Sequence, residues 1–299
     1  MHFIGFLHQT REAISVSRVC LKECKVLLGA SGKVGRMVRT LMQGDGSGLI
    51  CLGRSGAPGV MKWTDIETQN FQGVQAVLAF WGVTSGNDRQ LSGNAELAIK
   101  AQELAVILGA ELVVHCSSVA VYGAQAEVLT EDSCLRPANA YGQAKSDMEK
   151  ALADWQASHP DGPRTIVLRL ANIAGADSLF GNLVPGGTVR LHRFPDGRGP
   201  CRSYISPVDL VTVLGRLSSS AEISGTFNLG APVATDMADI VRAAGAKIEW
   251  ERAPRDAIQE VAVDMTQLVS HLPGLSLAHD ATTLVSDVHA AGGWSGNSL

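Results

Sequence analysis

The segment KVLLGASGKVG, residues 25–35, decides the fold of this 299-residue chain. Its apolar run over residues 25–29 is typical of a buried parallel strand, and the glycines that follow are typical of a tight turn into a helix over residues 34–42. Such a turn lets the backbone approach a pyrophosphate bound at the amino terminus of the helix. The segment therefore predicts a dinucleotide-binding unit, with these cofactor-binding residues: Gly29, Ser31, Gly32, Lys33, Val34 and Gly35.

Short apolar runs alternate with helical patterns along the next part of the chain. The expected helix over residues 88–108 has Glu96 and Lys100 paired at i,i+4 and Gly109 as its stop. This alternation indicates βαβ units on a parallel sheet, so we predict an α/β, Rossmann-type doubly wound fold. The other elements expected are strands over 49–52, 60–63, 76–80, 111–116 and 165–170 and a helix over 144–158.

The predicted organisation is one dinucleotide-binding domain with a smaller carboxyl-terminal substrate-binding part. The Rossmann domain is expected over residues 24–172, rejoined by the chain at about 205–230, and residues 1–23 are expected to be an amino-terminal extension. The smaller part is expected from residues 173–204 and 231–299, where Pro and Gly interrupt the pattern. It would lie over the carboxyl ends of the strands, where open α/β sheets bind their ligands.

Composition excludes several other classes of protein. The net charge is −4 and the sequence pI about 6.1, so no basic surface for nucleic acid is expected. No apolar run reaches the roughly 18 residues that span a bilayer. Among the six cysteines only Cys20 and Cys24 lie close together, so we expect no metal site and a reducing, cytoplasmic setting.

The end of the second strand bears on the choice of cofactor. An acidic residue about 20 positions after the glycine turn binds the adenosine ribose in NAD-binding folds, but here Gly53 is followed by Arg54 and Ser55. The planar guanidinium of Arg54 suits a 2′-phosphate, and Lys33 and Arg36 add positive charge nearby. All three cations are also compatible with a solvated surface. We therefore expect NADP in preference to NAD.

Three further side chains have the chemistry of hydride transfer. Tyr141 and Lys145 are one helical turn apart, which places the hydroxyl and the ammonium on one helix face. A free tyrosine has a pKa near 10, and a nearby ammonium favours the phenolate. Ser118, at the end of a strand, has a hydroxyl suited to donate to the same substrate oxygen. We predict Ser118, Tyr141 and Lys145 as the catalytic residues.

Taken together, these motifs resemble the extended short-chain dehydrogenase/reductase family, the NAD(P)-dependent epimerases and dehydratases. The resemblance covers roughly residues 24–295 and is much more specific for the family than for one activity. The matching segments are GASGKVG at 29–35, HCSSVAVYG at 115–123, YGQAK at 141–145, LRLANIAG at 168–175, RSYISPVDL at 202–210, GTFNLG at 225–230 and VAVDMTQLVSHLPGLS at 261–276.

The resemblance implies roles for matching positions. Ser118 matches the catalytic serine, Tyr141 the acid/base tyrosine, and Lys145 the lysine that binds the nicotinamide ribose and lowers the tyrosine pKa. Asn172 and Arg202 match residues that contact the substrate near its phosphates, and Asp209 one that is usually structural. Family members commonly pair through the two helices expected over 88–108 and 144–158, so a homodimer is expected.

The chain also departs from the family at three places. The 4,6-dehydratases resemble one another in an Asp-Glu pair after the catalytic hydroxyl, and Val119-Ala120 stands there, which disfavours dehydration. Phe80 and Trp81 replace the small residues that usually line the cofactor, so Trp81 either covers the cofactor or packs in the core. The substrate-side segments are short for a nucleotide-sugar enzyme. His115 is expected to be a packed strand residue.

These observations leave more than one function open. The first is an enzyme that moves a hydride between a nicotinamide and a sugar or another secondary alcohol or ketone, with a nucleotide sugar among the candidate substrates. Within it, an epimerase that keeps its cofactor competes with an NADPH-dependent carbonyl reductase for a small substrate. The alternative from another class is a non-catalytic NADP-binding regulatory module. The presence of serine, tyrosine and lysine together favours the enzyme.

Overall fold

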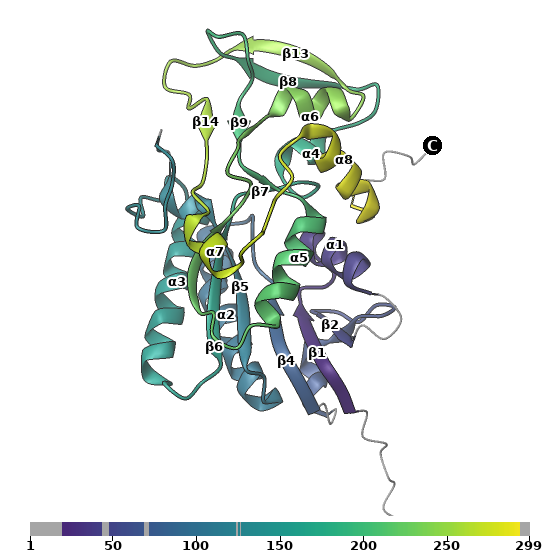
Figure 1. Ribbon diagram of the computed structural model, residues 1–299, viewed down its shortest axis with the longest axis vertical. Helices are drawn as coiled ribbons and strands as arrows, with labels where there is room; N and C mark the ends of the chain where they lie inside the picture. Colours follow the sequence, from purple (N-terminus) through teal and green to yellow (C-terminus); the bar gives the residue numbers. More distant parts are fainter. Residues whose placement is uncertain (1–19, 44–47, 69–71, 124, 126, 294–299) are drawn as a thin grey trace, which may run out of the picture.

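The computed structural model describes residues 20–43, 48–68, 72–123, 125 and 127–293. Its centre is a seven-stranded parallel sheet in the order β11-β6-β5-β4-β1-β2-β3 (Figure 1). The chain moves outward from β1 through β2 and β3 and then returns to the other side of β1 with β4. This reversal defines a doubly wound α/β sheet and confirms the predicted fold. The strands are β1 (Cys20–Leu28), β2 (Leu49–Gly53), β3 (Met61–Lys62), β4 (Gln72–Ala79), β5 (Leu112–Ser118), β6 (Arg164–Leu170) and β11 (Gly225–Leu229).

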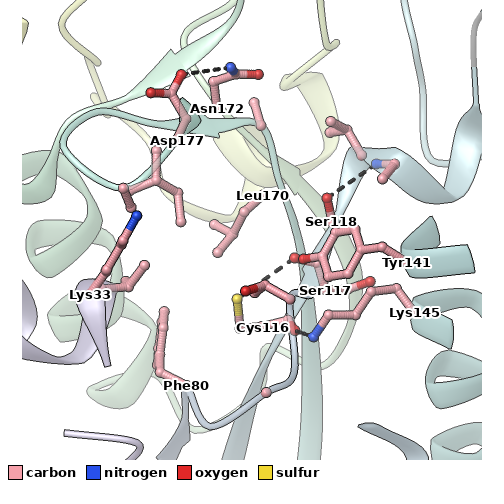
Figure 2. Close-up of a pocket in the computed structure, with 18 of the residues that line it drawn as sticks. Lys33, Phe80, Cys116, Ser117, Ser118, Tyr141, Lys145, Leu170, Asn172 and Asp177 are labelled. Atoms are coloured by element: carbon pink, nitrogen blue, oxygen red, sulfur yellow. Dashed lines mark hydrogen bonds between the residues drawn. The ribbon is translucent and has the colours of Figure 1, made fainter. Parts of the chain in front are cut away.

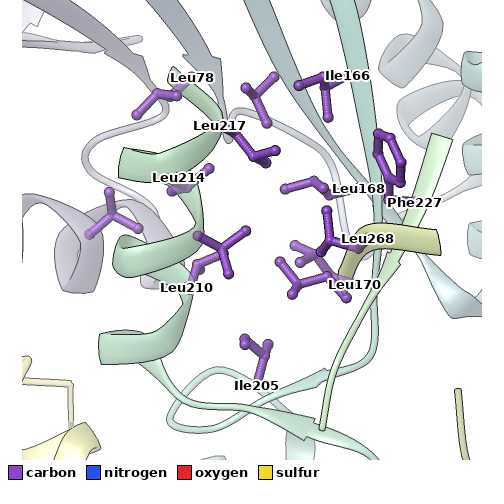
Figure 3. Packing of buried hydrophobic residues seen from close by; sticks show 14 of the residues in the cluster. Leu78, Ile166, Leu168, Leu170, Ile205, Leu210, Leu214, Leu217, Phe227 and Leu268 are labelled. Carbon is purple, nitrogen blue, oxygen red and sulfur yellow. The ribbon is translucent and has the colours of Figure 1, made fainter. Parts of the chain in front are cut away.

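Helices cover both faces of the sheet. On one face α2 (Asp88–Leu108) lies beside α3 (Ala140–Ser158), and on the other α1 (Lys33–Met42) lies beside α5 (Pro207–Ser218) (Figure 1). The layer between the sheet and α5 is the larger hydrophobic core, closed at the β11 side by α7 (Thr266–His271). Figure 3 shows leucines of β6 and α5 meeting in this core together with Phe227 of β11.

A smaller part lies over the carboxyl ends of the central strands (Figure 1). Its short strands form three small sheets around a core of their own. The paired strands are β7 (Asn172–Ile173) with β10 (Tyr204–Ile205), β9 (Cys201–Arg202) with β12 (Thr235–Asp236) and β14 (Glu260–Val261), and β8 (Thr188–Arg193) with β13 (Lys247–Arg252). Its helices are α4 (Ser178–Asn182), α6 (Met237–Ala243) and α8 (Ala281–Ala290), and two 3₁₀ helices, η1 (Trp63–Thr68) and η2 (Val119–Tyr122), belong to the larger part.

The element boundaries differ from the sequence expectations in instructive places. The helix expected to start at residue 144 begins at Ala140, because the Asn139 side chain caps it by accepting from the Gly142 amide. Only Met61 and Lys62 of the strand expected over 60–63 pair with β2, and the chain turns into η1 at Trp63. Strand β1 begins at Cys20, and residues 1–19 of the expected extension lie outside the described residues.

Two kinds of feature are absent from the described residues. No helix in this part of the chain is long and apolar enough to span a bilayer. Nor do its His, Cys, Asp and Glu side chains gather into a group of three that would hold a metal ion.

Candidate active site

A pocket of about 630 Å³ opens where the carboxyl ends of β1, β4, β5 and β6 meet the smaller part (Figure 2). This is the crevice that the doubly wound topology creates. Ten of the predicted site residues line it: Gly32, Lys33, Val34, Phe80, Trp81, Ser118, Tyr141, Lys145, Asn172 and Arg202. The predicted residues Gly29, Ser31, Gly35, Arg54 and Ser55 lie outside its lining.

The amino terminus of α1 is open toward this pocket. Its N-cap is Gly32, which has no side chain to bond the first amides, and its first turn contains no acid. By contrast α2, α3, α5, α6 and α8 are each capped by a side chain. The first amides of a helix have no intrahelical partner and favour an anion. The uncapped end of α1 therefore fits a dinucleotide pyrophosphate.

Two glycines of the turn serve close packing. Gly29 has a φ of +83°, and a Cβ there would lie 2.6 Å from the Trp81 amide nitrogen. A Cβ on Gly35 would overlap the carbonyl oxygen of Gly29 itself. Gly29 is thus needed where β1 meets the end of β4, and Gly35 where α1 meets the turn. These two glycines therefore give the turn its shape, whereas Gly32, Lys33 and Val34 line the pocket.

Ser118 and Tyr141 lie together on one wall of the pocket (Figure 2). Ser118 ends β5 and caps η2, because its Oγ accepts from the Ala120 amide at 3.2 Å. Tyr141 sits in the first turn of α3, next to the cap at Asn139. Burial raises the pKa of Tyr141 and the nearby Cys116 thiol raises it further, while a hydrogen bond with the Ser118 side chain opposes them. Burial therefore favours the protonated phenol over the phenolate at Tyr141.

Lys145 is held rigidly beside the tyrosine. Its side chain is 3% exposed, and its Nζ donates to the Cys116 carbonyl oxygen at 2.7 Å. The Nζ lies 6.0 Å from the centre of the Tyr141 ring. Burial lowers the pKa of Lys145, and the charges of Cys116 and Glu149 raise it in opposition. The Lys145 ammonium was expected to lower the pKa of Tyr141. In the structure, burial of the phenol is the largest effect, and it raises this pKa.

The loop after β4 lines the pocket next to the glycine turn. Asn94 of α2, which is 2% exposed, bonds both the amide and the carbonyl of Val83 and so fastens this loop. Trp81 meets Trp63 edge to face at 5.9 Å, and its Nε1 is buried without a hydrogen-bond partner among the described residues. Trp81 packs against the core, which is one of the two alternatives, and it also lines the pocket; that it covers a cofactor stays a prediction.

The residues expected at the adenosine end are set apart from the pocket. Arg54 and Ser55 follow β2 and are exposed, and no acidic residue occupies the end of this strand. Ser31 is exposed as well, and Arg36 donates to its carbonyl oxygen at 2.8 Å. This end thus presents a guanidinium and two hydroxyls to solvent.

The residues predicted on the substrate side are held in place by hydrogen bonds. Asn172 Nδ2 and the Tyr204 hydroxyl both donate to Asp177 Oδ2, at 2.9 and 2.8 Å (Figure 2 shows the first). The Arg202 guanidinium donates hydrogen bonds to the carbonyl oxygens of Cys201, at 2.7 Å, and Gln259, at 2.8 Å. No carboxylate among the described residues forms an ion pair with Arg202. Asn172 and Arg202 therefore line the pocket while also holding the backbone of the smaller part.

Sequence reasoning missed several lining residues. Asp177 is the most polar of them, and its position as the N-cap of α4, five residues after Asn172, was a signal that pointed to it. Cys116 and Val261 lie in segments that match the family but were given no role, and Thr84 lies in none of those segments. Val119 and Ala120, which stand in the place of the Asp-Glu pair, line the pocket, so no carboxylate directly follows Ser118 there. His115 is 1% exposed, a packed strand residue as expected.

Residues 26–193 match the model of the NAD dependent epimerase/dehydratase family, and the chain belongs to this family. Among curated proteins it is similar to two UDP-glucose 4-epimerases. That from Azospirillum brasilense is 44% identical over 70 residues, 23% of this chain and 20% of the relative. That from Lactobacillus helveticus is 45% identical over 67 residues, 22% of this chain and 20% of the relative. The chain thus aligns with about a fifth of the length of the curated relatives it matches.

Solved structures share the whole fold. A UDP-glucose 4-epimerase from Brucella ovis in complex with NAD has a TM-score of 0.73 at 18% identity, covering 88% of this chain and 96% of its own. A UDP-glucose-4-epimerase from Stenotrophomonas maltophila, with bound NAD and formylated UDP-arabinopyranose, has a TM-score of 0.71 at 20% identity, covering 89% and 96%. A short-chain dehydrogenase/reductase superfamily protein from Agrobacterium tumefaciens with bound NAD has a TM-score of 0.71 at 21% identity, covering 91% and 97%.

Proposed function

We propose that this protein moves a hydride between a nicotinamide dinucleotide and a secondary alcohol or ketone of a sugar. The observation that carries the proposal is that Ser118, Tyr141 and Lys145 share one pocket with the uncapped end of α1. This chemistry has two requirements. One is a helix terminus that attracts the pyrophosphate of the dinucleotide, and the other is a phenol with a serine hydroxyl beside it. The hydride acceptor and donor is the nicotinamide, when a dinucleotide is bound.

The proton follows a separate route through this chain's own residues. In the oxidative direction the Tyr141 oxygen, as phenolate, takes the proton of the substrate hydroxyl while the carbon bearing it loses its hydride. In the reductive direction the phenol returns a proton to the carbonyl oxygen. Ser118 donates a hydrogen bond to that same oxygen and steadies the charge that develops on it. Lys145, held on the Cys116 carbonyl, supplies the positive charge that favours the phenolate.

Within this chemistry we propose epimerisation of a nucleotide sugar as the first candidate. Its support is the 44% identity over 70 residues to a UDP-glucose 4-epimerase. The partly buried, carboxylate-free guanidinium of Arg202 and the amide of Asn172 are suited to a diphosphate at the far end of the pocket. Dehydration is disfavoured because Val119 and Ala120 offer no acid for loss of water.

A reductase for a smaller carbonyl compound is the second candidate. The indole of Trp81 narrows the pocket beside the expected cofactor position. We also propose that Arg54 and Ser55 favour NADP over NAD, since a guanidinium and a hydroxyl stand where an acid would bind the ribose. NADPH is the usual donor in reductions, so this preference supports the reductase.

The partner is proposed to be a second copy of the chain. The exposed side chains of Val106 and Ile107 lie at the end of α2, beside α3, on the outer face of the sheet. A homodimer through α2 and α3 would cover them. Light scattering of the purified protein tests this. A mass of about twice 31.5 kDa supports the dimer, and the monomer mass contradicts it.

The experiment that tests the function starts from protein purified without added cofactor. Release of a bound dinucleotide by denaturation, followed by its mass, identifies NAD or NADP. The protein is then incubated with UDP-glucose and, separately, with NADPH and a panel of ketones. A new UDP-sugar epimer without net consumption of cofactor supports the epimerase, and steady loss of NADPH supports the reductase. Binding of a dinucleotide without either reaction would leave a non-catalytic module and contradict the proposal.

A further inference from the structure

A buried polar network lies behind the wall that carries Ser118 and Tyr141. Glu149 accepts the Ser117 hydroxyl at 2.5 Å and pairs with Arg169 at 2.8 Å. From there Arg169 Nη1 donates to the Tyr122 hydroxyl at 2.9 Å, which donates to Asn228 Oδ1 at 2.7 Å. We call these five residues the Glu149 network. The side chains of Arg169 and Glu149 are 9% and 10% exposed, so the ion pair is almost wholly buried.

Each member of the network belongs to an element that positions the candidate catalytic groups. Ser117 precedes Ser118 in β5, and Tyr122 ends η2, the 3₁₀ helix that Ser118 caps. Glu149 lies on α3, one turn after Lys145 and two after Tyr141. The network therefore joins the strand that carries the serine to the helix that carries the tyrosine and the lysine.

The far end of the network reaches the substrate side. Asn228 Nδ2 donates to the Leu129 carbonyl oxygen at 2.9 Å and to that of Asp264 at 3.3 Å. Leu129 is bridged in turn to Val263, in the segment that follows β14. Val261 of β14 lines the pocket. One chain of hydrogen bonds thus runs from behind Ser118 to the segment next to the substrate end.

We infer that Glu149 and Arg169 are positioning residues, which set the separation of the Ser118 and Tyr141 hydroxyls and tie it to the segment after β14. This inference rests on the proposed function. A buried ion pair gives little net stability, because desolvating both charges offsets their attraction. Its donors and acceptors do, however, define one geometry for the groups they join. Replacing the pair with neutral residues should therefore keep the fold and lose the alignment.

The test compares the double variant Glu149→Gln/Arg169→Met with the wild type. Because no unpaired charge stays buried, the double variant should fold, unlike Arg169→Met alone. We expect kcat to fall about tenfold, since small misplacements of reacting groups cost large factors in rate. KM and the affinity for the dinucleotide should stay within about twofold of the wild type. This result would distinguish misaligned catalytic hydroxyls from weaker binding of the substrate or the dinucleotide. Asp209→Asn, which removes a charge that holds α5 to the Ala278 amide, is the matched control and should keep kcat.

A second readout is independent of activity. Hydrogen–deuterium exchange should become faster in residues 117–123 and 140–146 of the double variant and stay unchanged there in Asp209→Asn. Wild-type exchange in both segments, or a kcat within twofold of wild type, would overturn the inference. If the wild type itself turns over no substrate, the proposed function fails, and the exchange comparison alone decides about the network. Should the double variant not fold, Ser117→Ala removes only the hydroxyl on Glu149 and must still speed exchange in residues 117–123.

Discussion

The two ends of the pocket differ in what holds their polar side chains. At the end where we propose hydride transfer, the hydride end, Lys145 donates to a backbone carbonyl of β5, and the Glu149 network lies behind the wall. At the substrate end, Asn172 and Tyr204 are bonded to Asp177, and Arg202 is spread over carbonyl oxygens of the smaller part. The hydride end presents hydroxyls backed by the central sheet. The substrate end presents groups that bind one another.

This difference suggests that one end of the pocket would carry out the reaction and the other would select the substrate. The groups at the hydride end come from a strand of the sheet and from the long helix α3, so their geometry suits any substrate that offers a carbinol at the right place. The groups at the substrate end come from short strands and loops, where small changes alter which substrate fits. Under the proposed function, the sheet and α3 would therefore supply the chemistry, and the smaller part would select the substrate.

Removal of the Tyr141 hydroxyl should have the largest effect. Tyr141→Phe should lower kcat about a thousandfold, since no other phenol lines the pocket in the described structure. Fold and dinucleotide affinity should be retained, as measured by thermal unfolding and a binding titration. Tyr204→Phe, a buried tyrosine of the substrate end, is the matched control and should leave kcat within a few-fold. Equal losses in both variants would erase the distinction between the two ends.

The pH dependence of the free energy of unfolding tests whether water is excluded from the hydride end. Burial, and the charge of Lys145, lower the pKa of His115 from 6.5 to about 3. The folded state thus keeps this histidine neutral while the unfolded state takes up a proton below pH 6.5. Stability from this effect is full above pH 6.5 and is lost as the pH falls toward 3. Between pH 7 and 5 the loss is about 2 kcal/mol.

Urea unfolding at these two pH values measures this loss. His115→Gln should make the difference smaller by that amount, and His192→Gln, at a half-buried position of the smaller part, should not. If His115→Gln had the pH dependence of the wild type, water would reach the strand behind Lys145.

Arg202 tests whether the substrate end binds an anion. Arg202→Met should raise KM for a UDP-sugar about tenfold and change kcat little, because a uniform binding contact is lost. The neighbouring exposed Arg198, paired with Asp196 at 3.0 Å, supplies the control Arg198→Met. An unchanged KM in steady-state kinetics would mean that the Arg202 guanidinium serves only the carbonyls it already bonds.

An effect of similar size concerns the adenosine end. Arg54→Asp should shift the ratio of the NADP and NAD dissociation constants about tenfold toward NAD, because a carboxylate repels a 2′-phosphate. Arg190→Asp, in an exposed position of the smaller part, should leave the ratio unchanged. Calorimetric titration with both dinucleotides gives the ratio. An identical ratio in wild type and Arg54→Asp would remove the argument for NADP.

The elements with local signals were predictable from the sequence. The helix at residues 88–108 was predicted at its observed bounds from the Glu96–Lys100 spacing and the stop at Gly109, which ends the helix in the left-handed region. The capping box that Asn87 and Gln90 form at its start was not predicted. The glycine turn and the Tyr-x-x-x-Lys spacing are likewise local patterns. By contrast, the run over residues 60–63 has no local feature that distinguishes a strand from a turn of 3₁₀ helix, and Trp63 departs from the strand toward Trp81.

The support of the site was beyond sequence reasoning for a physical reason. Glu149 and Arg169 are 20 residues apart on different elements, and Tyr122 and Asn228 are 106 apart. Only the packed sheet brings them together. The same holds for Arg202 and Gln259, whose contact spans 57 residues. A motif thus predicts which side chain reacts, and the tertiary fold determines what holds it.

A crystal structure of the protein with NAD or NADP shows most directly whether this pocket receives the nicotinamide. We expect the pyrophosphate on the amides of Gly32, Lys33 and Val34. It also predicts the reactive face of the ring turned to the hydroxyls of Ser118 and Tyr141, with room between them for one substrate carbon. A dinucleotide bound elsewhere, or a nicotinamide directed away from Tyr141, would contradict it.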